Sequence, residues 1–550
     1  MTKTNRTSLL ISIAIVGVVL SWLGASRWLV PVFIESVYRG ESFSVLNAMI
    51  SGQADHALAE YLMEWNQIGW QIALILLSIG LLLLVFNRPE VRRLADDKLQ
   101  MRQCPWNNAS KIFLVIVLLL SMATNLVDLY IHGRAGLPPI PGDTQDYDNI
   151  AFNLSHGRGF ALDFTDTEWR EPYLRHNANG LYDDILSRQI SFRLTTYRPP
   201  AMPALLAGTY VVFGRSFLAW QIVSSAMMAT AVTLAVALCL RFAGWGPAVL
   251  MVLLAVASQP LRRFSYDFLT ESMASLAITM LAWMVVQANE RRMIRYAVGV
   301  GLMLGLSLLV RSIFIFWYLL VPLLVWWIWS RPKTVPRPRH CYVAPAVCLL
   351  VAVAVALPWW IRNCVVLDRL MPLGSQGAIN LPAAYGEQAV ANMGVWKPMD
   401  FSEFYDEHRG QTLSPIDEER EMAVHGLRKA LRWIAANPLK VPLLISYKLR
   451  DLWKPEDALH ALIIFFAAVG TAAALQKSAG PPRAVTVTLL SLLLFNSISV
   501  AMTYSAGWRL MVPVELLLDV LASIGLWKTG LLTIHVSRLA FINGNERSRP

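Results

Sequence analysis

Long apolar runs separated by short polar loops are the main pattern along the chain. Twelve of these runs approach the roughly 20 residues that a helix needs to cross the hydrocarbon core of a bilayer. They cover residues 9–26, 68–86, 112–131, 217–240, 245–261, 269–288, 296–311, 312–330, 342–361, 458–475, 484–504 and 510–527. The pattern predicts an all-α polytopic membrane protein with about twelve transmembrane helices.

Two of the intervening loops are long, residues 132–216 and 362–457. The first contains an apolar stretch at 204–213 that is too short to cross a bilayer, which predicts a short helix in the membrane interface. In the second, Ser414 to Asp417 form a capping-box pattern with Pro415 at the first helical position, followed by apolar residues at helical spacing. We expect an amphipathic helix there, lying over the membrane core.

Basic residues gather in alternate loops, which predicts the orientation of the chain. Clusters of lysine and arginine occur at residues 3–6, 88–102, 291–295, 331–339, 477–483 and 538–549. By the positive-inside rule these loops face the cytoplasm, so both long loops face away from it. The sequence therefore predicts a multi-pass protein of the bacterial inner membrane whose polar, potentially chemical surface is periplasmic.

Composition supports a membrane protein and changes how the charge is interpreted. With 55% hydrophobic and 15% charged residues, the chain is too apolar for a water-soluble fold. A net charge of +11 would suggest nucleic acid in a soluble protein, but here the basic residues are topology signals, so we expect membrane lipids and no nucleic acid as partners. The five cysteines show no CxxC spacing and predict neither a disulfide framework nor a zinc site.

Three segments are expected from this organisation. Residues 1–105 form an N-terminal extension with two spans and a basic linker, residues 106–530 form the main transmembrane module, and residues 531–550 form a cytoplasmic tail. Internal repeats are not visible in the sequence. The role of the two-span extension does not follow from its residues.

A motif directly after the third span carries a family resemblance. Residues 142–160 resemble the first outer loop of GT-C glycosyltransferases of the protein O-mannosyltransferase and lipid A aminoarabinose-transferase type. The matching residues are Asp143, Tyr147, Ala151, Leu154, Gly157, Gly159 and Phe160. Thr144 stands where the family often has Glu, and Asp146 could supply that second carboxylate instead.

The resemblance continues in order over roughly residues 110–530. It includes Tyr197 to Pro200, Leu269 to Ser272, Leu309 to Ser312, Trp360 to Asn363, Asn437 and Pro438 with Lys448 and Trp453, and Trp508 to Pro513. It implies an inverting transferase that moves a hexose or pentose from a polyprenyl-phosphate donor to a hydroxyl of a glycan, lipid or protein acceptor. The sequence names neither the sugar nor the acceptor.

Three carboxylates are candidate catalytic groups: Asp143, Asp146 and Glu271. A sugar hydroxyl attacks poorly unless a base accepts its proton, and an ionised Asp143 next to the membrane surface could do so. Asp143 could instead be the N-cap of the helix that follows it. Asp143 and Asp146 could also bind a divalent cation, although the sequence requires no cofactor.

Arginines at the outer ends of spans are candidate ligands for the donor phosphate. They are Arg198, Arg311, Arg362 and Arg509. The planar guanidinium group can hold two phosphate oxygens and keeps its charge, but snorkelling or phospholipid contact would also place arginines there. Tyr147, Tyr197 and Arg263 are candidate substrate contacts, with surface exposure the alternative for Arg263.

Other functions fit the same pattern. Twelve spans with intramembrane charges would also suit a transporter or flippase of lipid-linked glycans. Against this, the polar residues lie mostly in two unequal outer loops. A polymerase or ligase of lipid-linked glycans would share the transfer chemistry. A phosphate loop of the GxxxxGK[ST] kind is missing from the sequence, as expected for a donor that is already activated.

Overall fold

The computed structural model describes residues 107–330, 340–397, 399–455, 457–475, 481–504 and 507–547. The predicted spans at 9–26 and 68–86 lie outside these residues. The chain divides into two compact units. One comprises residues 103–453 and 474–524 and contains every candidate site residue; the other comprises residues 1–102, 454–473 and 525–550.

Helices occupy every predicted span that falls within the described residues. They are α5 (Asn108–Ile131), α10 (Phe217–Ala243), α11 (Trp245–Ala257), α13 (Glu271–Arg291), α14 (Ile294–Val310), α15 (Trp317–Ser330) preceded by the 3-10 turn η1 (Ser312–Phe316), α16 (His340–Val366), α22 (Ala458–Leu475), α23 (Pro481–Thr503) and α24 (Val512–Arg547). Six helices of the described chain are long and apolar enough to cross a membrane. A membrane-spanning helical fold is therefore confirmed, and the total of twelve spans stays a prediction.

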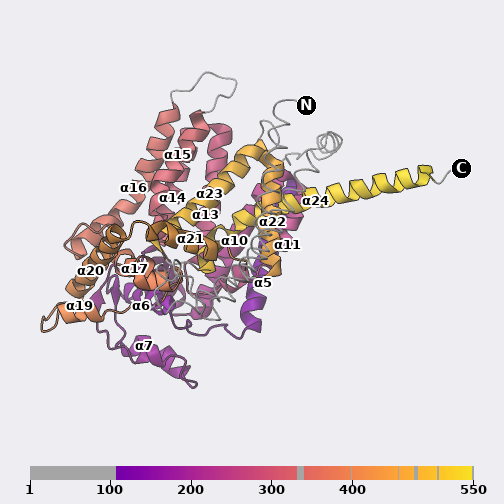
Figure 1. Cartoon of the computed structure of the whole chain (residues 1–550). Coiled ribbons are helices and arrows are strands. Elements are labelled where there is room, and N and C mark those ends of the chain that lie inside the picture. Colours follow the sequence, from indigo (N-terminus) through magenta and orange to yellow (C-terminus); the bar gives the residue numbers. More distant parts are fainter. Residues whose placement is uncertain are drawn as a thin grey trace, which may run out of the picture. The chain divides into compact units, whose positions relative to one another are not determined.

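Close packing in the larger unit forms a helical bundle (Figure 1). Helix α14 packs against α13 and α16, and α10 packs against α5, α11 and α13. Two glycines of α14 allow its approach to α16, because a Cβ atom at Gly301 would lie 2.5 Å from the Cys348 carbonyl oxygen, and one at Gly305 would lie 2.6 Å from Val355 Cβ. Small residues at such contacts are typical of packing between membrane helices.

The first long loop folds into a small lobe. It contains α6 (Asp143–Ser155), α7 (Thr167–Arg175), α8 (Asp183–Leu186) and α9 (Ala201–Phe213), the last lying where the short interfacial helix was expected. It also contains two antiparallel strands, β1 (Ala161–Leu162) and β2 (Arg193–Leu194). The expectation of an all-α chain was therefore wrong at this one point, because the two extended segments that flank α7 and α8 pair with each other.

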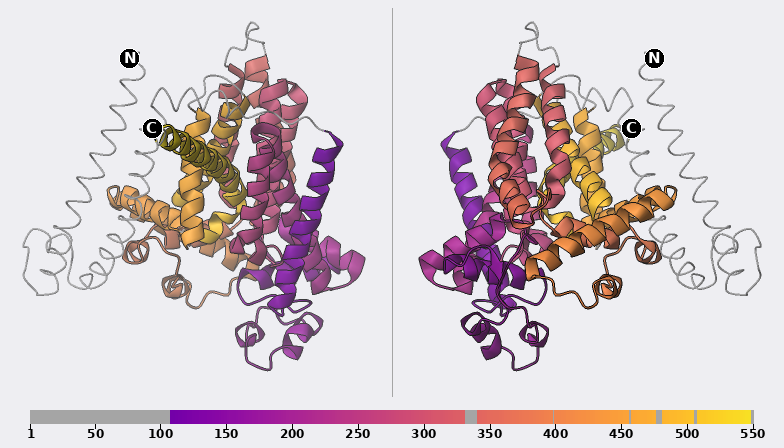
Figure 2. Two further views of the ribbon diagram at one scale, coloured as in Figure 1. Left: turned by 90° about the vertical axis from the view of Figure 1, so that its right-hand side faces the viewer. Right: turned by 90° about the vertical axis from the view of Figure 1, so that its left-hand side faces the viewer.

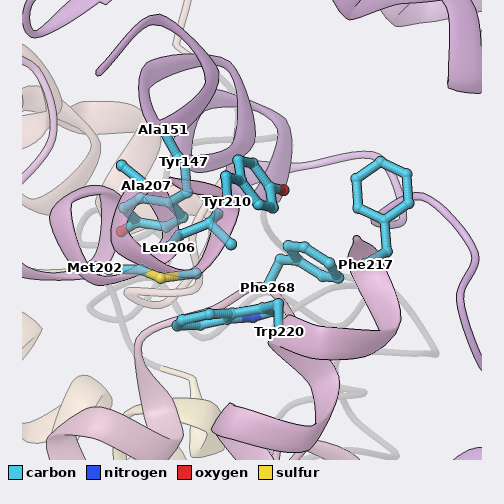
Figure 3. Packing of buried hydrophobic residues seen from close by; sticks show 9 residues of the cluster. All are labelled: Tyr147, Ala151, Met202, Leu206, Ala207, Tyr210, Phe217, Trp220 and Phe268. Carbon is cyan, nitrogen blue, oxygen red and sulfur yellow. The ribbon is translucent and has the colours of Figure 1, made fainter. Parts of the chain in front are cut away.

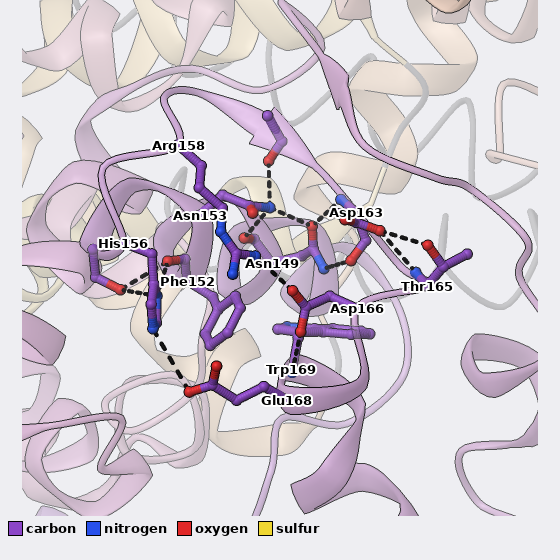
Figure 4. Close-up of polar contacts among 12 residues, drawn as sticks. Asn149, Phe152, Asn153, His156, Arg158, Asp163, Thr165, Asp166, Glu168 and Trp169 are labelled. Carbon is purple, nitrogen blue, oxygen red and sulfur yellow. Dashed lines mark hydrogen bonds and ion pairs between the residues drawn. The ribbon is translucent and has the colours of Figure 1, made fainter.

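Helix α6 is held on two sides. Figure 4 shows the amide of Asn149 bonded in both directions to the backbone of Asp163, at 2.7 and 2.6 Å, while Asn153 donates to the Ala161 carbonyl oxygen at 3.1 Å. On another side, Tyr147 packs into an apolar cluster with residues of α9 and α10 and with Phe268 (Figure 3). The position of α6 is thus fixed by both polar and apolar contacts.

The second long loop contains a further set of helices. They are α17 (Gln376–Ala384), α18 (Glu387–Ala391), α19 (Ser402–Glu407), α20 (Pro415–Ala436) and α21 (Lys440–Trp453). Helix α20 begins as predicted, with the Ser414 hydroxyl accepting the Asp417 backbone N–H at 3.3 Å. The two views of Figure 2 show both long loops at the same end of the bundle.

Candidate active site

Asp143 is the first residue of α6, and its side chain does not cap the helix. Gly142 is the N-cap, with φ at 141°, a value that suits glycine. The side chain of Gln145 accepts the Gly142 backbone N–H at 2.6 Å. The alternative role of Asp143 as the N-cap is therefore wrong, because the helix is capped one residue earlier, at Gly142. The Asp143 carboxylate is left to interact with other elements.

Arg198 joins the two carboxylates of α6. Its Nε and Nη2 atoms donate to Asp146 Oδ2 at 2.9 and 2.6 Å, and Nη2 also donates to Asp143 Oδ1 at 2.8 Å. The guanidinium is 6% exposed and lies over the rings of Tyr147 and Tyr197, at 5.3 and 4.9 Å from their centroids. Two ion pairs and two aromatic faces thus orient this arginine.

The ion pairs extend from Asp143 to two further predicted residues. Arg509, in the 3-10 turn η2 (Trp508–Leu510), contacts Asp143 Oδ2 at 3.3 Å and also donates to Glu271. Glu271 is the first residue of α13, and its Oε1 atom accepts from Arg311 Nη2 at 2.6 Å. Arg311 follows the last residue of α14 and donates to Thr270 Oγ1 at 2.6 Å as well.

The result is a continuous charged network of three carboxylates and three arginines. We call it the ion-pair network; in order of contact it runs Asp146, Arg198, Asp143, Arg509, Glu271 and Arg311. Its members come from segments far apart in sequence. All six were predicted from the sequence to face the same side of the membrane.

Charge and burial set the protonation of the network. Arg198, with a further contribution from Arg509, lowers the pKa of Asp143 to about 2, although burial opposes the shift. Asp143 is therefore ionised throughout the physiological range. Burial raises the pKa of Tyr147 to about 12, so its hydroxyl remains a hydrogen-bond donor. Glu271 Oε2 is buried and has no hydrogen-bond partner among the described residues.

Asp267 is a site residue that sequence reasoning missed. It lies four residues before Glu271, in the short segment that connects α12 (Gln259–Arg263) to α13. Burial, helped by the charge of Glu271, raises the pKa of Asp267 to about 6, against the opposing charges of Arg263, Arg134 and Arg509. The available signal was its position four residues before Glu271; its surroundings in the fold could not be read from the sequence.

Two predicted arginines lie apart from the ion-pair network. Arg362 donates to the backbone oxygens of Thr195 and Phe160, at 2.7 and 3.2 Å, and stacks on Trp359. It therefore supports the backbone that precedes Arg198. Arg263 is exposed and lies over the ring of Phe264 at 6.0 Å.

The carboxylates of α6 do not fit a divalent cation as they are arranged. The guanidinium of Arg198 bonds both Asp143 and Asp146, so it occupies the position between them. Within the described residues, no three His, Cys, Asp or Glu side chains come together as a metal site. The arrangement favours a site neutralised by arginine.

A buried carboxylate of the second loop positions the segment that carries Arg198. Glu419 accepts from the Thr195 hydroxyl at 2.8 Å, from the Thr196 N–H and hydroxyl at 2.8 and 2.7 Å, and from the Ser375 hydroxyl at 2.7 Å. These contacts join α20 to the end of the first loop. We call this group of contacts the Glu419 clamp.

Part of the chain matches the sequence model of a known protein family. Residues 197–360 match the sequence model of a family described as dolichyl-phosphate-mannose-protein mannosyltransferase. The match includes Arg198, Asp267, Glu271 and Arg311, while Asp143 and Arg509 lie outside it. No curated protein sequence matches the chain significantly.

Two solved structures resemble the fold at low sequence identity. One is ArnT from Cupriavidus metallidurans bound to undecaprenyl phosphate, at 12% identity and a TM-score of 0.41, with 78% of this chain and 64% of that chain covered. The other is the oligosaccharyltransferase AglB from Archaeoglobus fulgidus in complex with an inhibitory peptide and a dolichol-phosphate, at 13% identity and a TM-score of 0.44, with 80% and 52% covered. The match thus spans less than two thirds of either protein's length.

The family match falls on the segment that contributes Arg198, Glu271 and Arg311 to the ion-pair network. Over these residues the chain is similar to the dolichyl-phosphate-mannose-protein mannosyltransferase family.

Proposed function

We propose that the chain transfers a sugar, with inversion, from a polyprenyl-phosphate donor to an acceptor hydroxyl at the exoplasmic face of the bacterial inner membrane. The observation that carries this proposal is the ion-pair network, which gathers three arginines and three carboxylates at the end of the bundle where both long loops lie. Such a site can meet the charge of a leaving phosphate and accept a proton from an attacking hydroxyl.

The arginines supply the donor-phosphate site. Each of Arg198, Arg311 and Arg509 is neutralised by a carboxylate of the network. A donor phosphate at Arg311 and Arg509 competes for these cations and receives charge-assisted hydrogen bonds as negative charge grows on the leaving oxygen. Arg362 is a fourth proposed phosphate ligand, since it forms no ion pair with a carboxylate of the described chain.

Asp143 is the proposed general base. Two arginines, Arg198 and Arg509, hold the pKa of Asp143 at about 2, so it is ionised but weakly basic. When the donor phosphate draws on Arg509, Asp143 loses part of this neutralisation and becomes more basic. It then accepts the proton of the acceptor hydroxyl while the hydroxyl oxygen bonds to C1 of the sugar and the bond from C1 to the phosphate oxygen breaks. Tyr147, Tyr197 and Arg263 are proposed substrate contacts.

The proposal is tested with the purified full chain in lipid nanodiscs. Undecaprenyl-phosphate hexoses and pentoses are offered as a panel together with an envelope extract as acceptor, and released undecaprenyl phosphate and glycosylated products are measured by mass spectrometry. We expect at least one donor to be consumed with formation of a sugar-bearing product. Movement of intact donor across a bilayer with no release from any donor would instead favour a flippase.

A further inference from the structure

Building on the proposed transfer reaction, we infer that Asn380 and Tyr197 form a subsite for a hydroxyl group of a sugar, next to the proposed base Asp143. Asn380 lies on α17 in the second loop, whereas Tyr197 and Asp143 lie in the first loop. The subsite makes the second loop part of the substrate site.

The start of α17 is fixed against the end of the first loop. A Cβ atom at Gly374, two residues before the helix, would lie 2.2 Å from the Thr196 carbonyl oxygen, so only glycine allows this approach. The hydroxyl of Ser375 donates to Glu419 at 2.7 Å, and Glu419 also accepts the Thr196 backbone N–H. Asn380 therefore belongs to a helix that direct contacts hold in place, as precise substrate recognition requires.

Gln376, the first residue of α17, connects this helix to the ion-pair network. In the orientation that satisfies both ends of its amide, the oxygen accepts from Arg198 Nη1 at 2.8 Å and the nitrogen donates to the Tyr197 carbonyl oxygen at 3.3 Å. The same guanidinium donates to Asp143 Oδ1 at 2.8 Å through Nη2. Helix α17 is thus joined to the proposed base through a single side chain.

Asn380 lies one turn after Gln376 and contacts the other end of Tyr197. Its Nδ2 atom donates to the Tyr197 hydroxyl at 3.2 Å. Within the described residues, the side-chain oxygen of Asn380 accepts no hydrogen bond and the Tyr197 hydroxyl donates none. Both side chains are partly exposed, so a ligand can reach them. A hydrogen-bond acceptor and a donor therefore lie side by side at this point.

This pair of groups suits a hydroxyl group. A hydroxyl group can donate to Asn380 Oδ1 and accept from the Tyr197 hydroxyl at the same time. An ionised phosphate offers only acceptors and an ammonium group only donors, so neither can use both groups. Because Asp143 must lie at the reacting carbon of the sugar, the hydroxyl belongs to the transferred sugar or to a sugar of the acceptor.

Deoxy analogues of the donor test the first source. The full chain in lipid nanodiscs and its Asn380→Ala and Tyr197→Phe variants are assayed with the active undecaprenyl-phosphate sugar and with its monodeoxy analogues. The wild-type protein should lose about tenfold in kcat/KM with one analogue, because a hydrogen bond is missing. Each variant should lose a similar factor with the complete sugar and no more with that analogue. The exposed amide control Gln388→Ala, in α18, should behave as wild type.

A titration of the acceptor tests the second source. If the subsite binds a sugar of the acceptor, both variants should raise the acceptor KM about tenfold, measured by dilution of the envelope extract. The donor KM and the slow release of undecaprenyl phosphate without acceptor should then stay unchanged. Periodate, which cleaves the vicinal diols of sugars, should remove the acceptor activity of the extract, whereas protease digestion should preserve it.

Wild-type kinetics of both variants in both assays would overturn the inference while leaving the transferase proposal intact. A fall in kcat that is equal for every donor analogue, with the acceptor KM unchanged, would show that Asn380 has only a structural role and would also overturn it. Absence of turnover by the wild-type protein would overturn both proposals.

Discussion

At the scale of single residues, Asp143 provides the most direct test of the proposed chemistry. Asp143→Asn keeps the size of the side chain but removes the base, so transfer should fall by about 10² to 10⁴-fold. Binding of undecaprenyl phosphate should persist or strengthen, because Arg198 and Arg509 lose a competing carboxylate. Single-turnover transfer and titration with undecaprenyl phosphate measure the two effects separately. Full transfer by this variant would rule out Asp143 as the base.

Arg198 allows a second test at this scale. Its fork bonds Asp146 through two nitrogens and Asp143 through one, a geometry that a lysine ammonium cannot reproduce. Arg198→Lys should therefore lose the paired contact to Asp146 and lower the melting temperature. It should also weaken undecaprenyl phosphate binding about tenfold, because Arg198 is one of the proposed phosphate ligands. The matched control is Arg158→Lys, since Arg158 pairs with Asp166 in the first loop but outside the network. Equal effects of both substitutions would contradict a specific role for Arg198.

The sequence predicted some of these residues well and others poorly. The order of the motifs and the alternation of basic loops placed Asp143, Arg198, Glu271, Arg311 and Arg509 on one side of the membrane, and the structure brings them into contact. Asp267 escaped notice because its raised pKa comes from its surroundings in the folded chain, next to the buried Phe268. Arg362 was grouped with the other arginines because it also ends a span. It donates to two backbone carbonyl oxygens outside the ion-pair network, and its role as a phosphate ligand stays a prediction.

At the scale of elements, the Glu419 clamp joins two loops. The bonds of Glu419 to Thr195 and Thr196 cross 224 and 223 residues of sequence, so no local pattern could reveal them. Helix α20 itself was predictable from the capping residues Ser414 and Asp417. Its amphipathic pattern, however, did not show that an acidic residue would be buried at its contact with the first loop.

Loss of the Glu419 clamp should lower the stability of the protein as well as its activity. Glu419→Ala leaves three hydroxyls and one backbone N–H without their acceptor, and should destabilise the protein by about 2 kcal/mol or more. Transfer should fall as well, because the backbone before Arg198 loosens. The neighbouring Glu418→Ala is the control, as Glu418 is partly exposed and lies 4.0 Å from Arg193 and 3.3 Å from Tyr405. In thermal unfolding, Glu419→Ala should have a clearly lower melting temperature than Glu418→Ala. Similar melting temperatures would contradict a stabilising role of the Glu419 clamp.

At the scale of the whole molecule, both long loops should be accessible from outside the cell. Single cysteines at Glu171 and Arg409, which are exposed in the first and second loops, should react with a membrane-impermeant maleimide on intact spheroplasts in a cysteine-free background. Cysteines at positions 95, 335 and 545, and at Met293 between α13 and α14, should react only after permeabilisation. Labelling at Met293 without labelling at Glu171 would reverse the proposed orientation.

The position of Arg509 in the chain has a consequence for biogenesis. Arg509 follows Glu271 by 238 residues and Asp143 by 366, so both carboxylates enter the membrane interface long before the arginine that bridges them is synthesised. At about 5 to 20 residues per second, translation needs on the order of 10 to 50 seconds to cover the shorter interval. During this time Glu271 depends on Arg311 alone for neutralisation. Nascent chains that stop before η2 should therefore expose an unfinished polar site within the bilayer and be preferred substrates for membrane proteases.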